Sequence, residues 1–266
     1  MRSMRLDAAM VERCTVVSRE RAKEMIKAGH VKINGVTIQK PAANVAEKDH
    51  IEVSGNRSSS YVGRGYLKLE KAMNSFHINL SGMYCLDVGA STGGFTQLLL
   101  ECGACKVTAV DVGTGQLAQV LRGDERVESL EKTDIRTVTR EQIGAVSFAC
   151  ADVSFISLKL ILPTLFSLLD ETGSAVCLLK PQFEAGPQRI GKRGVVKDQN
   201  VHAAVIKRVL ASAEDVGFSI GGMTHSPILG GEGNLEFLVY LHKNRQSVAL
   251  PEIEQIVQTA WRELLA

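Results

Sequence analysis

Asp87-Val88-Gly89-Ala90-Ser91-Thr92-Gly93-Gly94-Phe95 is the stretch that decides the fold, because it leads from an apolar run directly into a helical pattern. Glycines in such a turn let the backbone bend tightly and approach a ligand, and free N–H groups at the helix start attract negative charge. Ser91 stands where a G-x-G-x-x-G motif has its second glycine, which weakens a dinucleotide interpretation. The stretch predicts a nucleotide-type cofactor site; a purely structural turn is the alternative.

An acidic residue ends the next apolar run. Asp111 lies 22 residues beyond Gly89, where a carboxylate can accept both hydroxyls of an adenosine ribose. NAD and S-adenosylmethionine both suit this geometry. Asp87 is placed to face a cationic amine, which S-adenosylmethionine carries together with a sulfonium where NAD has a diphosphate. Because the sequence also lacks a Cys or His constellation typical of redox chemistry, S-adenosylmethionine is favoured.

Outward from this turn, apolar runs alternate with helical patterns. Such repeated units with apolar strands predict an α/β fold built on a doubly wound, Rossmann-like sheet. The expected strands cover 84–88, 107–111, 146–152 and 175–180, with two adjacent strands over 218–222 and 235–242, and the expected helices include 95–100, 158–169, 200–216 and a final amphipathic helix over 253–264 that docks on the body.

Ionisable side chains stand at strand ends and at the borders of this body. Asp152 ends the third run, Lys180 ends the fourth, Lys68 precedes the first, and Glu236 opens the last strand. Ligands of open α/β sheets bind at the carboxyl ends of strands. A lysine that ends an apolar run is costly to bury as a cation, a situation that suits a base. Each charge alone fits an ordinary ion pair, whereas four around one crevice predict a catalytic set.

Charge divides the chain into two parts. The net charge is +2, but residues 1–70 carry 13 Lys and Arg against 8 Asp and Glu, and the remaining residues carry 18 against 21. A polar, Gly/Ser-rich stretch at 54–60 is typical of a linker. We therefore expect a basic, polyanion-binding domain over 1–54, a linker over 55–62 and the α/β domain over 63–266.

The basic part has the pattern of a small α+β domain. It predicts a helix near 6–13, a second helix capped by Ser18 and ended by Gly29, a hairpin with an Asn34-Gly35 turn, and a closing strand over 51–53. The basic side chains expected to contact a nucleic acid are Arg5, Arg19, Arg21, Lys23, Lys27 and Lys32, with Arg64 at the start of the larger domain.

A second basic stretch follows Lys180 in the chain. Residues 188–197 hold Arg189, Lys192, Arg193 and Lys197 together with two glycines. This stretch is either an RNA-contacting lid over the site or a solvated surface loop.

Composition narrows the class of protein. No run approaches the roughly 18 apolar residues that span a bilayer, and the first residues lack the apolar core of a signal peptide. Six cysteines without an export signal suggest a reducing cytoplasm. Cys102 and Cys105 have CxxC spacing without a second pair or a nearby His, and the histidines show no ligand spacing, so no metal is expected.

Nine strings in order are similar to those of a known family. They are RLD at 5–7, SRERA at 18–22, GHVKING at 29–35, RGYLKL at 64–69, DVGASTGGF at 87–95, DVG at 111–113, DVSFISL at 152–158, KPQFE at 180–184 and GNLEF at 233–237. The body resembles the FtsJ-type ribose 2′-O-methyltransferases. The whole of 5–243 resembles their TlyA branch, also named haemolysin A, and the N-terminal part resembles an S4 RNA-binding domain.

The resemblance implies an S-adenosylmethionine-dependent enzyme that methylates cytidine ribose in the ribosomal RNA of ribosomal subunits. The family's Lys-Asp-Lys-Glu tetrad falls on Lys68, Asp152, Lys180 and Glu236. In it Lys180 is the base on the 2′-hydroxyl, Asp152 and Lys68 orient that base, and Glu236 holds the hydroxyl or its lysine partner. Cys14 stands at a turn away from the chemistry, where relatives have Gly. The implied cofactor-binding residues are Asp87, Gly89, Ser91, Thr92, Gly93, Gly94, Phe95, Asp111 and Asp134, the last beside the adenine.

Three other functions compete with this one. A ribosome-assembly factor would bind RNA and cofactor without catalysis, but the intact tetrad argues against it. A membrane-active haemolysin would need an apolar span or a long lytic helix, and the sequence has neither. A nicotinamide-dependent oxidoreductase would use the same turn with a different cofactor.

Overall fold

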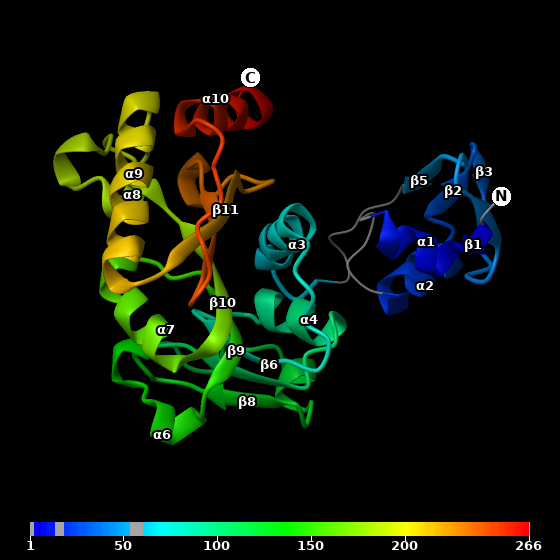
Figure 1. Ribbon diagram of the computed structural model, residues 1–266, viewed down its shortest axis with the longest axis horizontal. Coiled ribbons are helices and arrows are strands. Elements are labelled where there is room, and N and C mark those ends of the chain that lie inside the picture. The colour runs from blue at the N-terminus through cyan, green and yellow to red at the C-terminus, as the bar shows by residue number, and fades with distance from the viewer. Residues whose placement is uncertain (1–2, 14–18, 54–60, 266) are drawn as a thin grey trace.

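The computed structural model describes residues 3–13, 19–53 and 61–265. The expected linker stretch 54–60, the Ser18 cap and Cys14 lie outside the described residues. The boundaries expected for the two domains therefore stay predictions. Figure 1 shows the N-terminal elements in blue and the elements of the larger domain in cyan to red.

The small domain is built from two short helices on short strands. Leu6, Met10, Ile26 and Val45 are fully buried in its core. The expected hairpin is confirmed, with positive φ at both residues of its Asn34-Gly35 turn, which matches the twist of paired strands. The elements are β1 (Ser3–Arg5), α1 (Leu6–Glu12), α2 (Arg19–Lys27), β2 (Val31–Ile33), β3 (Val36–Thr37), β4 (Asn44–Ala46) and β5 (Ile51–Val53). Strands β1 and β4, which pair with each other, were not predicted.

The larger domain is built on one seven-stranded sheet. Its order is β11-β12-β10-β9-β6-β7-β8, and β12 runs antiparallel to both of its neighbours while the strands from β10 to β8 are parallel. The predicted doubly wound α/β fold is confirmed. The strands are β6 (Tyr84–Val88), β7 (Lys106–Val110), β8 (Val127–Leu130), β9 (Val146–Ala151), β10 (Leu169–Leu179), β11 (Ser219–His225) and β12 (Phe237–His242).

Helices cover both faces of this sheet (Figure 1). In β6, Cys85 belongs to the core under α3 and α4, whereas Leu86 and Val88 belong to the core on the other face, under α7, α9 and α10. This alternation follows from the pleat of a strand. The helices are α3 (Gly65–Phe76), α4 (Gly94–Glu101), α5 (Gln119–Arg122), α6 (Arg140–Ile143), α7 (Leu162–Leu168), α8 (Pro181–Glu184), α9 (Gln199–Val216) and α10 (Ile253–Leu264).

Two sequence expectations differ from the structure in extent. The helix expected over 158–169 is a 3₁₀ turn, η3 (Leu158–Leu160), followed by α7, whose start suits Pro163 because proline lacks an N–H. Strand β10 then begins at Leu169, six residues earlier than expected. Its first part is a polar segment, and the register of its pairing with β9 shifts between Leu169 and Ser174. Helix α3 and strand β8 were not predicted.

The strand order reverses between β6 and β9. From β6 the chain passes to β7 and β8 on one side, and then returns to β9 on the other side. A crevice forms at the carboxyl ends of strands at such a point. Gly89, Asp111 and Asp152 are the residues that follow β6, β7 and β9, so the topology brings them to this crevice.

Candidate active site

The turn after β6 approaches the chain that leaves β9. Gly89 has a φ of +80°, and a Cβ at this residue would lie 2.4 Å from the main-chain oxygen of Asp152. Glycine alone combines this left-handed backbone with so close a contact. The turn and Asp152 are therefore held at a fixed spacing.

A cavity of about 750 Å³ lies beside this turn, at the ends of β6, β7 and β9. Its wall combines apolar side chains with a few hydroxyl and carboxyl groups, which is the usual lining of a cofactor site. Four of the expected cofactor-binding residues belong to this wall, namely Gly89, Ser91, Asp111 and Asp134, together with Val112, Ile135, Asp152, Ser154 and Phe155.

Asp111 braces the turn and keeps acceptor capacity. Its Oδ2 accepts the N–H of Ser91 at 2.8 Å, and its Oδ1 accepts the N–H of Gly113 at 2.7 Å. Each carboxylate oxygen has a second lone pair. Asp111 therefore has acceptor capacity left for the hydroxyl groups of a ligand.

Asp134 lies on the wall but is engaged by its own turn. It caps the 3₁₀ helix η2 (Ile135–Thr137), and its Oδ2 lies 2.5 Å from the guanidinium of Arg136. The hydrogen bond from Arg136 lowers the pKa of the Asp134 carboxyl. Its carboxylate is therefore already paired with Arg136, and the adjoining Ile135 contributes an apolar side chain to the cavity wall.

Asp87 differs from the expectation that it faces a cationic amine. The pleat of β6 turns it toward α4, where it is fully buried, and Thr96 Oγ1 donates to its Oδ2 at 2.6 Å. Burial raises the pKa of Asp87 to about 7. Asp87 is absent from the cavity wall and braces the start of α4 instead.

Thr92, Gly93, Gly94 and Phe95 do not line this cavity, and the last two of them are the first residues of α4. Gly93 is the residue before the first turn of α4, and Phe95 is buried. A Cβ at Gly94 would lie 2.9 Å from the main-chain nitrogen of Tyr66. Gly94 therefore allows α4 to approach α3 closely, and α3 carries Lys68.

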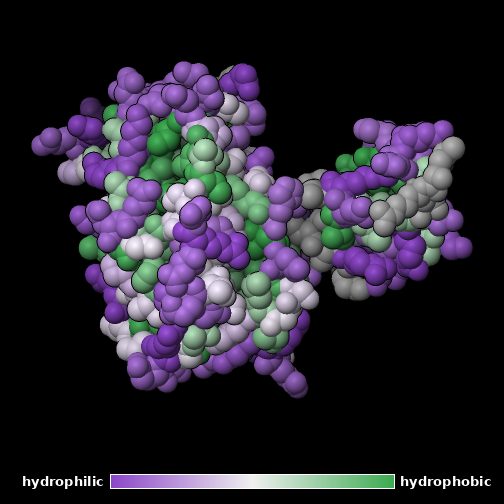
Figure 2. All heavy atoms as spheres, viewed as in Figure 1, coloured by the Kyte–Doolittle hydropathy of each residue, from purple (hydrophilic) through white to green (hydrophobic). Residues whose placement is uncertain are grey.

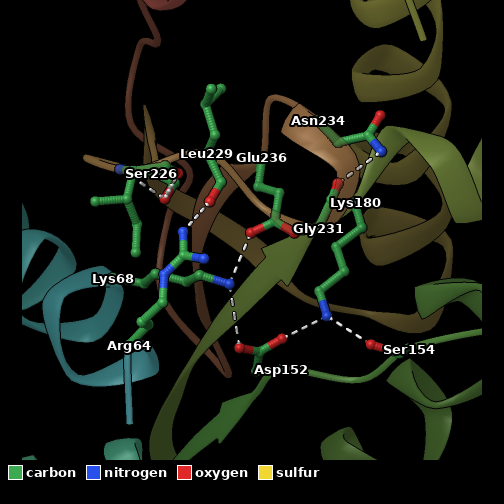
Figure 3. A network of polar contacts seen from close by, with 11 residues as sticks. Arg64, Lys68, Asp152, Ser154, Lys180, Ser226, Leu229, Gly231, Asn234 and Glu236 are labelled. Carbon is green, nitrogen blue, oxygen red and sulfur yellow. Dashed lines mark hydrogen bonds and ion pairs between the residues drawn. The ribbon is translucent and has the colours of Figure 1, made fainter. Parts of the chain in front are cut away.

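The four expected catalytic side chains meet in one series of contacts (Figure 3). Lys68 Nζ lies 2.8 Å from Glu236 Oε2 and 3.5 Å from Asp152 Oδ2. Lys180 Nζ lies 2.6 Å from Asp152 Oδ1. Lys68, Lys180 and Glu236 are 7%, 8% and 2% exposed, so these charges are largely shielded from water. The series thus alternates two amino groups with two carboxyl groups.

Ser154 extends this series and was not predicted as a site residue. Lys180 Nζ donates to its Oγ at 2.8 Å (Figure 3). Ser154 stands two residues after Asp152 in the DVSFISL string. Its short polar side chain beside a strand-end carboxylate was the available signal.

Phe155 is a second residue that the sequence analysis missed. It is 91% exposed, lines the cavity, and has a φ of +64°, which is rare for a bulky residue. Its ring lies 5.0 Å from that of Phe183. Strained backbone of this kind clusters at functional sites.

The expected RNA-binding residues lie in varied surroundings. Arg5 and Arg19 each approach Asp7 Oδ2 at 3.0 Å, and the hydrogen bond from Arg5 lowers the pKa of Asp7 to about 2. Arg64 donates to the main-chain oxygen of Leu229 at 2.6 Å. Lys27 is exposed, Lys23 and Lys32 are half-buried, and the side chain of Arg21 lies outside the described part.

No helix of residues 3–13, 19–53 and 61–265 is both long and apolar enough to cross a bilayer. Within the same ranges, no group of three or more His, Cys, Asp or Glu is arranged to hold a metal ion.

Two protein families match the chain. Residues 61–243 match the FtsJ-like methyltransferases, and residues 4–51 match the S4 domain. The first match covers the elements of the larger domain from α3 to β12, and α10 lies beyond it. The second covers most of the small domain and ends at the first residue of β5.

Similar proteins match over nearly their full length. "Putative rRNA methyltransferase YqxC" of Bacillus subtilis is 44% identical, covering 98% of this chain and 95% of its own. The 16S/23S rRNA (cytidine-2′-O)-methyltransferase TlyA of Mycobacterium tuberculosis is 40% identical, covering 98% of both chains. A solved structure, "Putative hemolysin from Streptococcus thermophilus", is 42% identical with a TM-score of 0.74, covering 99% of this chain and 97% of its own. The chain therefore belongs to the FtsJ-like methyltransferase family, whose cofactor is S-adenosylmethionine, and it carries an S4 domain toward its N-terminal end.

Proposed function

We propose that this protein transfers a methyl group from S-adenosylmethionine to the 2′-hydroxyl of a cytidine ribose in ribosomal RNA, acting on ribosomal subunits in the cytoplasm. One observation carries the proposal. Contacts run without a break from Glu236 through Lys68 and Asp152 to Lys180, and Asp152 belongs to the wall of the cavity. A base beside a cofactor cavity is what transfer to a hydroxyl requires.

The cavity wall supplies the groups that S-adenosylmethionine needs. When bound, this cofactor provides a methyl group that a positively charged sulfur already activates. Asp111 would accept the ribose hydroxyls, Gly89 would let the backbone approach, and the segment at Asp134 and Ile135 would flank the adenine. Asp87 would act indirectly, by accepting the hydrogen bond from Thr96 that joins the end of β6 to the first turn of α4.

Lys180 would take the proton from the 2′-hydroxyl. A neutral amine has two N–H groups and one lone pair, and Nζ has two fixed acceptors, Asp152 Oδ1 at 2.6 Å and Ser154 Oγ at 2.8 Å. With both N–H groups held, the lone pair is left for the incoming hydroxyl. When the proton moves from the ribose oxygen to Nζ, Asp152 stabilises the new ammonium, and the oxygen becomes the nucleophile.

Lys68 and Glu236 would set the charge of Asp152. Lys68 lies between the carboxylates of Asp152 and Glu236, so Asp152 would share its negative charge between Lys68 and Lys180. Glu236 fixes Lys68 in that place. Of the two roles that the resemblance implied for Glu236, holding its lysine partner is the one that this contact supports.

Three observations support RNA as the substrate. The S4 match and its basic side chains favour a polyanion. The TlyA relative is named for cytidine ribose in 16S and 23S rRNA. Phe155 offers an exposed ring on the cavity wall, and aromatic rings of this kind stack with unpaired bases.

A transfer assay tests the proposal. The full chain is incubated with methyl-labelled S-adenosylmethionine and with each ribosomal subunit separately. We expect label in the RNA, and at least a 100-fold loss of rate for Lys180→Ala. Lys207→Ala is the matched control, because Lys207 is an exposed lysine on α9 paired with Glu254.

Other outcomes separate the competing functions. Cofactor binding without transfer to either subunit would overturn the proposal in favour of an assembly factor. Calorimetric binding of NAD and not of S-adenosylmethionine would indicate an oxidoreductase. Lysis of vesicles by the purified, cofactor-free protein would restore the membrane-active function.

A further inference from the structure

Residues 188–197, here called the basic loop, form an exposed positive segment between α8 and α9. Figure 1 shows it as the yellow-green loop beside α9. No acidic residue occurs from 185 to 197. The four cations of the loop, all exposed, are Arg189, Lys192, Arg193 and Lys197.

These cations lack the partners that neutralise many others in the larger domain. Lys106, Arg122, Arg126, Arg136 and Lys207 each pair with a carboxylate. Among the residues that the structure describes, none of the four loop cations forms an ion pair or a side-chain hydrogen bond. Since residues beyond 70 carry more acidic than basic groups, unpaired positive charge here is a local feature that favours an anionic partner.

The basic loop and the first turns of α9 line a second, open cavity. This cavity has a volume of about 780 Å³. Its polar groups include Arg189, Lys197 and the amide side chains of Gln188 and Asn200, and its apolar lining is Ile190, Val195, Val201 and Ala204. The one carboxylate on its wall, Asp198, is engaged as the α9 cap and accepts the N–H of Asn200 at 2.8 Å. Cations with neutral amides are a donor set suited to phosphate oxygens.

A buried asparagine ties this loop to the catalytic series. Asn234 is 3% exposed; its Nδ2 donates to the main-chain oxygens of Gly194 and Gly231 at 3.0 and 3.1 Å, and its Oδ1 accepts the N–H of Val196 at 3.2 Å. Figure 3 shows Asn234 and Gly231 on the segment that leads to Glu236. Because Glu236 holds Lys68, the basic loop has a fixed position relative to the catalytic groups.

We propose that the basic loop binds the phosphodiester backbone of the RNA strand that carries the target ribose, and that Asn234 is the positioning residue that keeps the loop in register with Glu236. The inference rests on the proposed function and deepens it. The small domain would then supply affinity at a distance, and the basic loop would align the strand at the site.

RNA binding measured without catalysis tests the loop directly. For Arg189→Ala/Lys197→Ala in the full chain, we expect a roughly tenfold weaker Kd for protein-free rRNA, and a log Kd against log salt slope that is smaller by about two. The KM for RNA rises while kcat and the Kd of S-adenosylmethionine stay within about twofold. Lys106→Ala/Lys207→Ala, which also removes two exposed cations but ones that are paired with carboxylates, is the charge-matched control and leaves the slope unchanged.

Asn234 is tested by a double-mutant cycle. Asn234→Ala alone weakens RNA binding and lowers kcat, and it weakens RNA binding much less when Arg189 and Lys197 are already alanine. Additive losses would show that Asn234 acts independently of the loop.

Two results would overturn the inference about the loop. One is a log Kd against log salt slope that is the same for Arg189→Ala/Lys197→Ala as for the unmodified chain, whatever the rate of methyl transfer. Weaker binding to intact subunits but not to protein-free rRNA would assign the loop to a ribosomal protein and also overturn it. Absent methyl transfer by the unmodified chain would count against the proposed function alone.

Discussion

Lys180 and Asp152 meet through a 2.6 Å contact between Nζ and Oδ1, although they follow two different strands. The parallel pairing of β10 with β9 places Cys177 opposite Ala151, so the two strands end next to each other at the same edge of the sheet. The contact is thus a product of register as much as of side-chain choice.

Lys180→Arg separates the charge of Lys180 from its ability to accept a proton. Arginine keeps the positive charge beside Asp152 but does not deprotonate in proteins. We expect kcat to fall at least 100-fold, about as far as in Lys180→Ala, with the Kd of S-adenosylmethionine within about threefold of the starting value. Single-turnover methyl transfer and calorimetry measure the two. An arginine variant with near-normal kcat would mean that charge alone suffices.

Asp111→Asn tests the cofactor wall. Loss of the carboxylate weakens hydrogen bonds to the ribose hydroxyls, and we expect the Kd of S-adenosylmethionine to rise about 10- to 100-fold. Calorimetry measures this Kd. Asp124→Asn, in an exposed pair with Arg126, is the matched control and leaves it unchanged. A Kd that changes equally in both variants would remove Asp111 from the site.

Gly89→Ala tests the close approach of the turn to Asp152. Alanine at this position suffers both the left-handed backbone and a Cβ only 2.4 Å from a main-chain oxygen. Gly82 has a φ of +72° and nothing within 4 Å of a built Cβ, so Gly82→Ala reports the cost of a positive φ without a steric contact. We expect Gly82→Ala to lower the free energy of unfolding by about 1 kcal/mol and Gly89→Ala by more, with loss of cofactor binding. Equal losses in chemical denaturation would contradict the contact.

Asp87→Asn tests the burial of Asp87 through pH. The pKa of Asp87 is raised from 3.8 to about 7 in the folded protein, so the folded state binds a proton more tightly than the unfolded state. Stability relative to Asp87→Asn therefore falls as pH rises from about 4 to 7, by an amount on the order of 4 kcal/mol. Denaturation of both proteins between pH 4 and 8 measures this difference. Parallel stability curves would show that Asp87 is not desolvated.

Glu184→Ala tests a clamp between two site segments. Glu184 Oε1 accepts the N–H of Leu158 at 2.7 Å, and its Oε2 accepts from Ser157 Oγ at 2.7 Å, which joins α8 after Lys180 to the segment after Asp152. We expect an approximately tenfold fall in kcat with little change in the KM for RNA, and partial rescue in Glu184→Gln. A fall in thermal stability with unchanged kcat would leave Glu184 a purely structural residue.

Two of the four candidate catalytic side chains were predictable because a general topological rule places them, whereas the full set of four came from the family resemblance. Asp152 and Lys180 end apolar runs, and the carboxyl ends of parallel strands share an edge. Which of their atoms touch was not predictable, since this depends on how β10 registers against β9. Ser154 and Glu184 were missed for the same reason, because both act through contacts between segments that the sequence does not pair.

The direction of the Asp87 side chain could not be predicted from its motif. The residue belongs to the same string as Gly89, but the pleat puts its side chain on the face of Cys85, under α4. Helix α3 was missed although Tyr66, Leu69 and Met73 have helical spacing. Strand β8 is short and lies at the sheet edge, where half-buried side chains leave no apolar run to recognise.

The measurement that tests the central claim most directly is the identity of the methylated nucleoside. Ribosomal subunits treated with the protein and S-adenosylmethionine are digested to nucleosides, and the products are separated and identified by mass. We predict 2′-O-methylcytidine as the new product, formed by the unmodified protein and lost with Lys180→Ala. Label on a base, on another ribose, or on no nucleoside would contradict the proposed reaction.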